Sequence, residues 1–234
     1  MTNNEEEVII PIDQITDFPN HPYKVKNDEK MQSMVQSVKE MGVIYPVIVR
    51  KKDDGKYEMI SGHRRKMASV LAGKKEIKCI VKNLTDDEAT ILMVDSNIQR
   101  EEILPSEKAY SYKMKLDAIK HQGRKIEETS NQLGGKNNES AQLLGEDQGD
   151  SGTQVRRYIR LTKLIPEILE KVDEKRIAFN PAVEISYLTQ EEQTKLYDAM
   201  ECNDATPSLG QAIHLKKLSQ AGMLTQEDID NTMS

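Results

Sequence analysis

The chain of 234 residues contains no tryptophan, only two phenylalanines and only two cysteines. Because aromatic rings are so scarce, its interior has to be built from Ile, Val, Leu and Met side chains. Cys79 and Cys202 lie far apart, and neither has a second Cys or a His nearby at the spacing of a zinc site. The sequence therefore argues against a structural zinc site.

Long apolar runs are also missing, and no segment resembles a signal peptide or a membrane span. We therefore expect a cytoplasmic protein with no membrane partner. The formal net charge of −6 argues against a uniformly basic protein that coats nucleic acid without specificity. Specific DNA binding needs only a local basic face, which this charge does not exclude.

The order of the elements predicts two domains and a tail. Residues 1–104 alternate short apolar runs with amphipathic stretches, which is typical of a small mixed α/β domain. Strands are expected there at 8–12, 46–49, 57–60 and 77–81, and helices at 28–41, 64–71 and 85–97. The pattern then becomes helical throughout, with helices expected at 105–121, 125–133, 139–147, 151–164, 166–172, 181–188 and 190–200. Residues 105–200 thus read as an all-α domain, and 201–234 as a short helical tail.

Two short segments in the first domain have the composition of a phosphate-binding corner. Ser61–Arg65 (SGHRR) and Asn97–Glu101 (NIQRE) each join an apolar run to a helical or polar one. Glycine lets the backbone approach a ligand closely, and arginines together with the amides of a helix start hold phosphates well. Taken alone, a GHRR sequence is also what a solvated helix start looks like.

Residues 139–164 of the helical domain match the spacing of a helix-turn-helix. Gly145 stands where two helices would cross, Gly149 follows four positions later in the turn, and Val155 lies six beyond that as an apolar anchor. Ser151 is the expected cap of the second helix. Residues 151–180 hold seven Lys or Arg against four Asp or Glu, a local positive surplus.

The first turns of a recognition helix enter the major groove, so its exposed face supplies the candidate DNA contacts. The base-edge candidates are Thr153, Gln154 and Arg157, and the phosphate candidates are Arg156, Arg160 and Lys163. The alternative is an ordinary helical hairpin with a solvated basic face. For the DNA-binding interpretation, Glu146, Asp147 and Asp150 have to point away from the phosphates.

Five segments in a fixed order resemble the ParB family of partition proteins, over roughly residues 7 to 200. They read VIIPIDQI, GVIYPVIVR, SGHRRKMASVLAG, SNIQREEILPSEKAYSYK and TQVRRYIRLTKLIPEILEKVDEKRIAFNPAVEISYL. The last of them resembles the ParB-like proteins of plasmids and integrative elements. The resemblance implies an α+β fold, in which a ParB/sulfiredoxin-like domain precedes the helix-turn-helix domain. Sulfiredoxin carries a catalytic cysteine at this corner, whereas this chain has Ser61 and His63, which excludes that sulfur chemistry.

The resemblance also implies a clamp controlled by CTP and Mg²⁺. Carried over by motif, Gly62, His63, Arg64 and Arg65 would wrap the phosphates, Asn97 would bind the magnesium–phosphate unit, and Arg100 would contact phosphate. The stretch 42–49 would line the cytosine.

This chain departs from the family pattern at three places. His63 and Ser96 stand where the family usually has glutamates, so we expect at most a slow CTPase switch. His21-Pro22-Tyr23-Lys24 replaces the usual Gln-Pro-Arg, which leaves Lys24 as the possible phosphate contact in that segment.

The partners implied by the resemblance are double-stranded DNA with a palindromic site, a second copy of the chain and a ParA-type ATPase. No sustained apolar heptad follows Met200, so the leucine-zipper-like dimerisation domain common in the family is not evident in this sequence. Two other functions remain open. One is a helix-turn-helix transcriptional regulator of a mobile element without clamp activity, and the other is a ParB-like nuclease.

Overall fold

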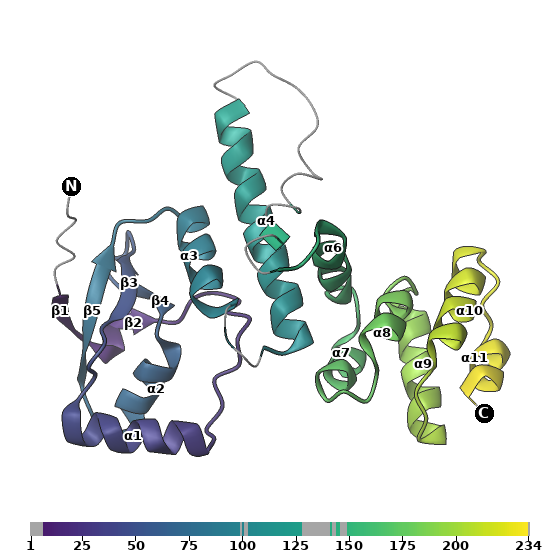
Figure 1. The fold of residues 1–234 in the computed structure, drawn as a ribbon, viewed down its shortest axis with the longest axis horizontal. Coiled ribbons are helices and arrows are strands. Elements are labelled where there is room, and N and C mark those ends of the chain that lie inside the picture. Colours follow the sequence, from purple (N-terminus) through teal and green to yellow (C-terminus); the bar gives the residue numbers. More distant parts are fainter. Residues whose placement is uncertain are drawn as a thin grey trace. The chain divides into compact units, whose positions relative to one another are not determined.

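The computed structural model describes residues 7–98, 100, 103–127, 141, 144–145 and 149–233 (Figure 1). The chain divides into two compact units. Unit 1 comprises Met1–Arg100 with Asp117–Gln132, and unit 2 comprises Glu101–Leu116 with Leu133–Ser234. Helix α4 (Pro105–Glu127) contributes its first half to unit 2 and its second half to unit 1. The predicted domain limits, 1–104, 105–200 and 201–234, remain predictions.

Unit 1 contains a five-stranded mixed sheet in the order β1-β5-β3-β4-β2. The strands are β1 (Glu7–Pro11), β2 (Ile15–Thr16), β3 (Val47–Lys51), β4 (Tyr57–Ser61) and β5 (Glu76–Lys82). Strands β3 and β4 form the predicted hairpin, while β3 pairs with β5 in parallel. Alternate apolar side chains from these strands form one core, which includes Val47, Val49, Met59 and Cys79.

The helices of unit 1 follow their sequence signals closely. Helix α1 (Glu29–Met41) is capped by Asp28, whose carboxylate accepts a hydrogen bond from the Met31 amide, and it ends at Gly42 with φ of 74°. Its apolar face packs with α2 (His63–Leu71) around Met31, Val35 and Ala68. Helix α3 (Asp86–Ile98) begins after Thr85, and the Thr85 amide donates to Glu88 in the expected first-turn position.

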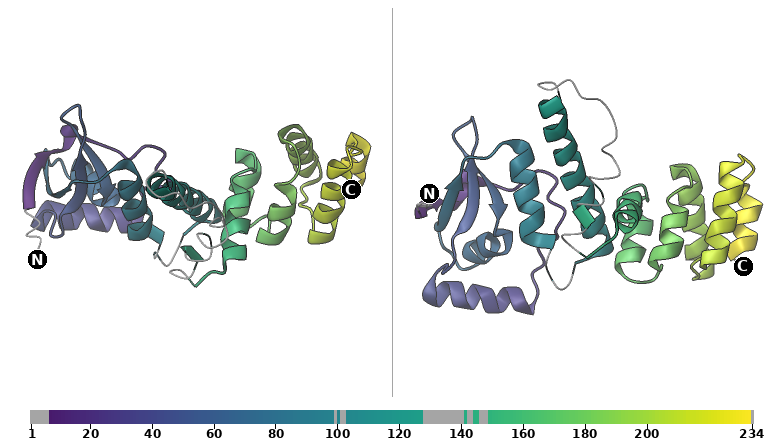
Figure 2. Two further views of the ribbon diagram at one scale, coloured as in Figure 1. Left: turned by 90° about the horizontal axis from the view of Figure 1, so that it is seen from above. Right: turned by 45° about the horizontal axis from the view of Figure 1, so that its top comes forward.

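Unit 2 is built from helices in every element that the structure describes there. After the start of α4 come α6 (Gly152–Leu161), α7 (Pro166–Asp173), α8 (Phe179–Ile185), α9 (Gln190–Asn203), α10 (Leu209–Gln220) and α11 (Gln226–Met233). Figure 2 shows α7 to α11 as successive short helices joined by tight turns. Together with α6 they share one apolar core, to which Leu161, Ile168, Ile185, Leu196 and Leu215 contribute fully buried side chains.

The expected α+β class is confirmed, and several helix boundaries differ from prediction. Helices α6, α8 and α9 end at Leu161, Ile185 and Asn203 and not at 164, 188 and 200, and two further differences have a clear cause. The helix predicted to stop at His121 continues to Glu127, because Gly123 in a helix interior costs only about 1 kcal/mol and does not end a helix. The helix predicted from Pro181 begins at Phe179, so Pro181 lies in its first turn. Proline is tolerated there because the backbone N–H groups of a first turn have no partner within the helix.

Two predicted helices extend outside the described residues. The helix at 139–147 and the end of the one at 125–133 lie largely outside the described residues. Within the described part of the chain, no helix is long and apolar enough to span a bilayer.

Candidate functional site

The predicted corner lies where β4 passes into α2, and Gly62 is the residue that makes this junction possible. Its φ is +109°, a value that L-amino acids rarely adopt. A Cβ atom placed there would lie 2.6 Å from Val47 Cγ1. Glycine is thus required both for the backbone conformation and for the close approach to β3, and it brings His63, Arg64 and Arg65 onto the first turn of α2.

Both corner arginines already have partners within unit 1. Arg64 Nη2 lies 3.0 Å from Asp28 Oδ1, and this hydrogen bond holds the pKa of Asp28 below its usual range. Arg65 Nη1 donates to the carbonyls of Tyr45 (2.7 Å) and Pro46 (2.6 Å). Burial lowers the pKa of Arg65, but an arginine remains charged in such a setting. Arg65 thus binds the segment before β3 to the start of α2.

Asn97 lies in the last turn of α3 and is only 3% exposed. Its Nδ2 donates to the carbonyl of Met93 at 2.7 Å and to Ser96 Oγ at 3.2 Å. These bonds use the amide nitrogen, so the amide oxygen is the group that can serve as a ligand for a hard cation. The guanidinium of Arg100 lies 5.4 Å from the centre of the Tyr23 ring.

His63, also predicted at this corner, is 8% exposed, and its ring stacks on that of His21 with centroids 3.7 Å apart. Burial, followed by the proximity of His21, lowers the pKa of His63 to about 3. His21 was not among the predicted site residues. Its only sequence signal was its place in the His21–Lys24 segment, where we expected a contact from Lys24 alone.

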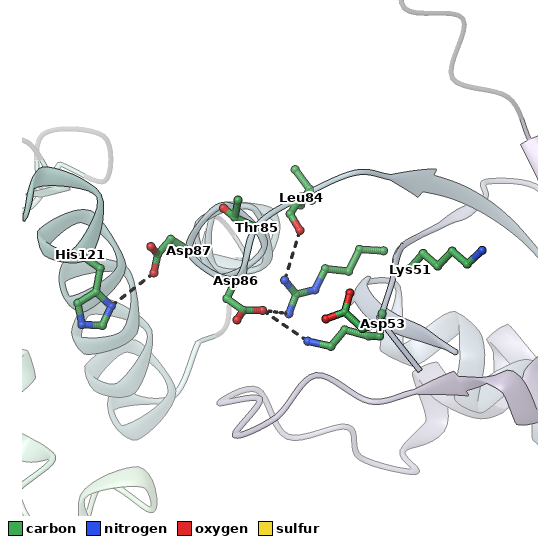
Figure 3. A pocket seen from close by; sticks show the side chains of 9 residues that line it. Lys51, Asp53, Leu84, Thr85, Asp86, Asp87 and His121 are labelled. Atoms are coloured by element: carbon green, nitrogen blue, oxygen red, sulfur yellow. Dashed lines mark hydrogen bonds and ion pairs between the residues drawn. The ribbon is translucent and has the colours of Figure 1, made fainter. Parts of the chain in front are cut away.

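A separate cavity of about 660 Å³ opens near the start of α3 (Figure 3). It lies at the end of β3 and the start of α3, whereas the corner lies at the end of β4 and the start of α2. Charges along its wall are paired with one another: Asp86 with Arg50 (2.6 Å) and Lys52 (3.5 Å), and His121 with Asp87 (3.5 Å). None of the predicted site residues is among the nine that line it.

In unit 2, the turn before α6 has the geometry that the glycine spacing predicts. A Cβ atom on Gly145 would lie 2.2 Å from the carbonyl oxygen of Asp150, and the same turn is closed by a hydrogen bond from the Asp150 amide to the Gly145 carbonyl. Gly149 has a positive φ of 71°. Val155 is fully buried against Gly145. Close packing at Gly145 and a left-handed residue at Gly149 are what a helix-turn-helix needs.

Helix α6 and the turn after it present the predicted DNA-facing side chains. Ser151 caps it by accepting from the Gln154 amide, as predicted. Thr153, Arg156 and Lys163 are exposed, and Gln154, Arg157 and Arg160 are half-buried. The contacts of Arg156 to Thr153 and of Arg157 to Gln154 are both long, at 3.4 Å.

Two of these arginines also contact α8. Arg157 Nη2 donates to Asn180 Oδ1 at 2.6 Å, and its guanidinium lies 5.0 Å from the centre of the Phe179 ring. Arg160 donates to both the hydroxyl (3.1 Å) and the carbonyl (2.7 Å) of buried Ser186. Sequence reasoning missed Asn180 and Ser186, because no local pattern links them to residues on α6.

The acidic residues beside the turn were the main objection to DNA binding. The carboxylate of Asp150 accepts hydrogen bonds from Lys108 and from the hydroxyl of Tyr112, both on α4. Its charge is thereby paired within unit 2. Glu146 and Asp147 lie outside the described residues.

Comparison with known proteins gives the chain a family. The profile of the ParB N-terminal domain matches residues 1–98. The chain is 30% identical over 210 residues to the chromosome-partitioning protein Spo0J of Thermus thermophilus, covering 90% of this chain and 70% of that protein. It is 33% identical over 174 residues to the nucleoid occlusion protein of Lysinibacillus sphaericus, covering 74% of this chain but only 52% of that protein.

Among solved structures, the Pnob8-like ParB-N domain aligns with 98% of this chain and 93% of its own, with a TM-score of 0.53 and 17% sequence identity. This similarity concerns the fold alone. The match at 30% identity that covers most of both chains, supported by the matching N-terminal profile, leads to one conclusion: the chain belongs to the ParB family of chromosome-partition proteins.

Proposed function

We propose that this ParB-family protein binds a specific double-stranded DNA site through α6. The observation that carries the proposal is the turn at Gly145 and Gly149, which leads into a capped helix with a basic, outward face. In this proposal Thr153, Gln154 and Arg157 meet base edges, and Arg156, Arg160 and Lys163 meet phosphates. The chromosome-partition role of the Thermus relative supports DNA as the partner.

The second part of the proposal is that a nucleoside triphosphate, CTP with Mg²⁺, binds at the corner of unit 1. Gly62 brings the start of α2 close to β3, and the first-turn amides and the arginines supply positive character for phosphates. The ion pair between Arg64 and Asp28 is partly exposed, so exchange of Asp28 for phosphate costs little. Arg65 would keep its carbonyl partners and hold stretch 42–49 against the base.

Asn97 would meet the hydrated magnesium through its amide oxygen, and Arg100 would meet a phosphate. With His63 and Ser96 in place of carboxylates, neither residue supplies the anionic base that rapid hydrolysis requires. The bound nucleotide would then act mainly as a switch that closes two copies of the chain on DNA. A homodimer, a palindromic site and a ParA-type ATPase complete the proposal.

Calorimetry with each of the four ribonucleoside triphosphates and Mg²⁺ tests the nucleotide. We expect CTP to bind more tightly than the other three. Site-directed cross-linking between two copies then tests closure, which CTP and the DNA site should increase. The Asn97→Ala variant should lose the nucleotide-dependent cross-link while retaining DNA binding. Thr90→Ala on the same helix serves as the control, since that hydroxyl donates to the Asp86 carbonyl. Equal cross-linking with and without CTP in the wild-type protein would refute the clamp.

A second candidate is a transcriptional regulator of a mobile element that uses the same α6 without a clamp. The internal partners of Arg64 and Arg65 favour it, because both side chains are already satisfied without a nucleotide. This candidate predicts DNA binding that no nucleotide affects. The nuclease alternative gains no support, since among the described residues no three His, Cys, Asp or Glu side chains are grouped to hold a metal.

A further inference from the structure

Two histidines far apart in the sequence meet in unit 1, where His63 is buried and His21 is half-buried. The rings of His21 and His63 lie 3.7 Å apart between centroids, with an angle of 35° between their planes. His63 is the first residue of α2. His21 ends a turn that is closed by a hydrogen bond from the His21 amide to the Phe18 carbonyl. The Nε2 atoms of both rings are buried and have no hydrogen-bond partner. A buried polar atom without a partner costs about 1–3 kcal/mol, so both nitrogens need a partner, which a bound anion can supply.

The pair is neutral in the structure as it stands. His21 Nδ1 lies 2.9 Å from the Tyr23 carbonyl, which can only accept, so the ring carries its proton on Nδ1 and Nε2 is a bare acceptor. Burial lowers the pKa of both rings, and that of His63 falls to about 3. Two charged imidazoles at this distance would repel each other strongly, and the start of α2 further disfavours a positive His63.

The charged groups that act on the pair come from several elements. Arg100 acts on both rings, and Lys66 on α2 acts on His63, each favouring the neutral ring. Asp17 opposes them, but its carboxylate already binds Lys66 Nζ at 2.7 Å. The surroundings are therefore on balance positive, which suits an anion.

We propose that His21 and His63 form one subsite for a polyphosphate, and that the ligand enters together with a single proton from solvent. The proton converts one Nε2 from an unpaired acceptor into a charged donor toward phosphate. The second ring stays neutral because of its contact with the first. This inference rests on the proposed nucleotide corner and adds His21 to it as a binding residue.

A metal ion is the competing occupant of bare imidazole nitrogens. Within the described part of the chain it would find only these two nitrogens grouped together and cationic neighbours around them. The two occupants respond to acid in opposite ways. Protonation displaces a metal, whereas an anion that binds with a proton is held more tightly as the pH falls.

The expected pH dependence follows from the shifted groups. In the free protein the pKa of His63 is about 3, and the pKa of His21 also lies below its ordinary value. An adjacent phosphate raises the pKa of the ring that takes the proton. Affinity should therefore rise as the pH falls through the bound-state pKa, by up to about tenfold per pH unit, and level off below the free-state pKa.

Isothermal titration calorimetry with tripolyphosphate and with Mg²⁺–CTP, between pH 5.5 and 7.5 in two buffers of different ionisation enthalpy, measures this proton directly. We expect uptake of up to one proton in the wild-type protein. The variants His21→Gln and His63→Gln should lose this uptake. The matched control His121→Gln should keep it, because that side chain is exposed and pairs with Asp87. Proton uptake by the ligand itself is the same with every variant, so the difference between wild type and variant gives the uptake by the protein.

Resonances of the four histidines, followed by NMR against pH, give a second readout. Ordinary titration of both His21 and His63 near pH 6.5 in the free protein would overturn the proposal, as would CTP binding without proton uptake. Binding that weakens in acid and requires Zn²⁺ or Mn²⁺ would assign the pair to a metal instead. Uptake with tripolyphosphate but no binding of CTP would keep this inference and reject the nucleotide. Absence of binding by both ligands would reject both.

Discussion

The corner of unit 1 and the outward face of α6 in unit 2 differ in how many of their side chains are buried or already hydrogen-bonded within the protein. At the corner, His63 and Asn97 are buried and Arg65 is bound to two backbone carbonyls. On α6, Thr153 and Arg156 are exposed, as is Lys163 just past its end. These exposed side chains can meet DNA as they stand, whereas Arg157 and Arg160 already donate to Asn180 and Ser186. A buried corner has to exchange partners to accept a ligand, and such an exchange is what a switch requires.

The two regions are alike in one respect, since each depends on a glycine that tolerates no side chain. Gly62→Ala should have the largest effect, a loss of about 2–4 kcal/mol in the stability of unit 1, because strain at positive φ adds to the clash with Val47. Urea denaturation measures it. Gly73→Ala is the matched control, because Gly73 has a φ of +73° but open space around its Cβ position. It should lose only the stability that corresponds to backbone strain at positive φ. Equal losses in the two variants would show that the contact with Val47 carries no weight.

Gly145→Ala applies the same test to unit 2. Its Cβ atom would press on the backbone carbonyl of Asp150, which cannot move without opening the turn. We expect a loss of about 1–3 kcal/mol in the stability of unit 2 and a greater loss of DNA binding. Gly210→Ala provides a helical control in unit 2 with open space around its Cβ position, and it should raise stability by up to about 1 kcal/mol. A Gly145→Ala protein with normal DNA affinity would argue against the helix-turn-helix.

Arg157→Ala should weaken binding to the specific DNA site by about 10- to 100-fold, and weaken binding to random DNA much less, because base-edge contacts carry specificity. Fluorescence anisotropy with both DNAs measures the ratio. Arg156→Ala on the same helix is the control, and it should weaken both interactions similarly and reduce their salt dependence. Equal losses for Arg157→Ala on the two DNAs would reassign that residue to phosphate contact or to packing with Asn180.

Asp28→Asn should have the smallest effect and acts only on the corner. An asparagine can still cap α1, but it no longer holds the charge of Arg64, so nucleotide binding should become a few-fold tighter. Calorimetry with Mg²⁺–CTP measures the change, and thermal denaturation checks that the cap is kept. Unchanged or weaker binding would mean that Arg64 does not turn to phosphate.

The sequence by itself determined nearly all the elements, the α+β class and the family. Those features depend on local signals: the apolar spacing of α1, the Asp53–Gly55 turn, the Ser151 cap and the glycine intervals before α6 act within a few residues. Local signals misled at helix ends: the helix predicted to stop at His121 continues to Glu127, because Gly123 alone does not end it, and the helix predicted from Pro181 begins at Phe179.

Only the tertiary structure decided which side chains meet. It stacked His21 on His63 across 42 positions, tied Arg157 to Asn180 and Arg160 to Ser186, and paired Asp150 with α4. None of these contacts has a periodic or nearest-neighbour signature, because each joins separate elements whose approach is set by core packing. The charge state of a buried ring and the availability of an arginine depend on such contacts. The chemistry of the corner was therefore not readable from its motif alone.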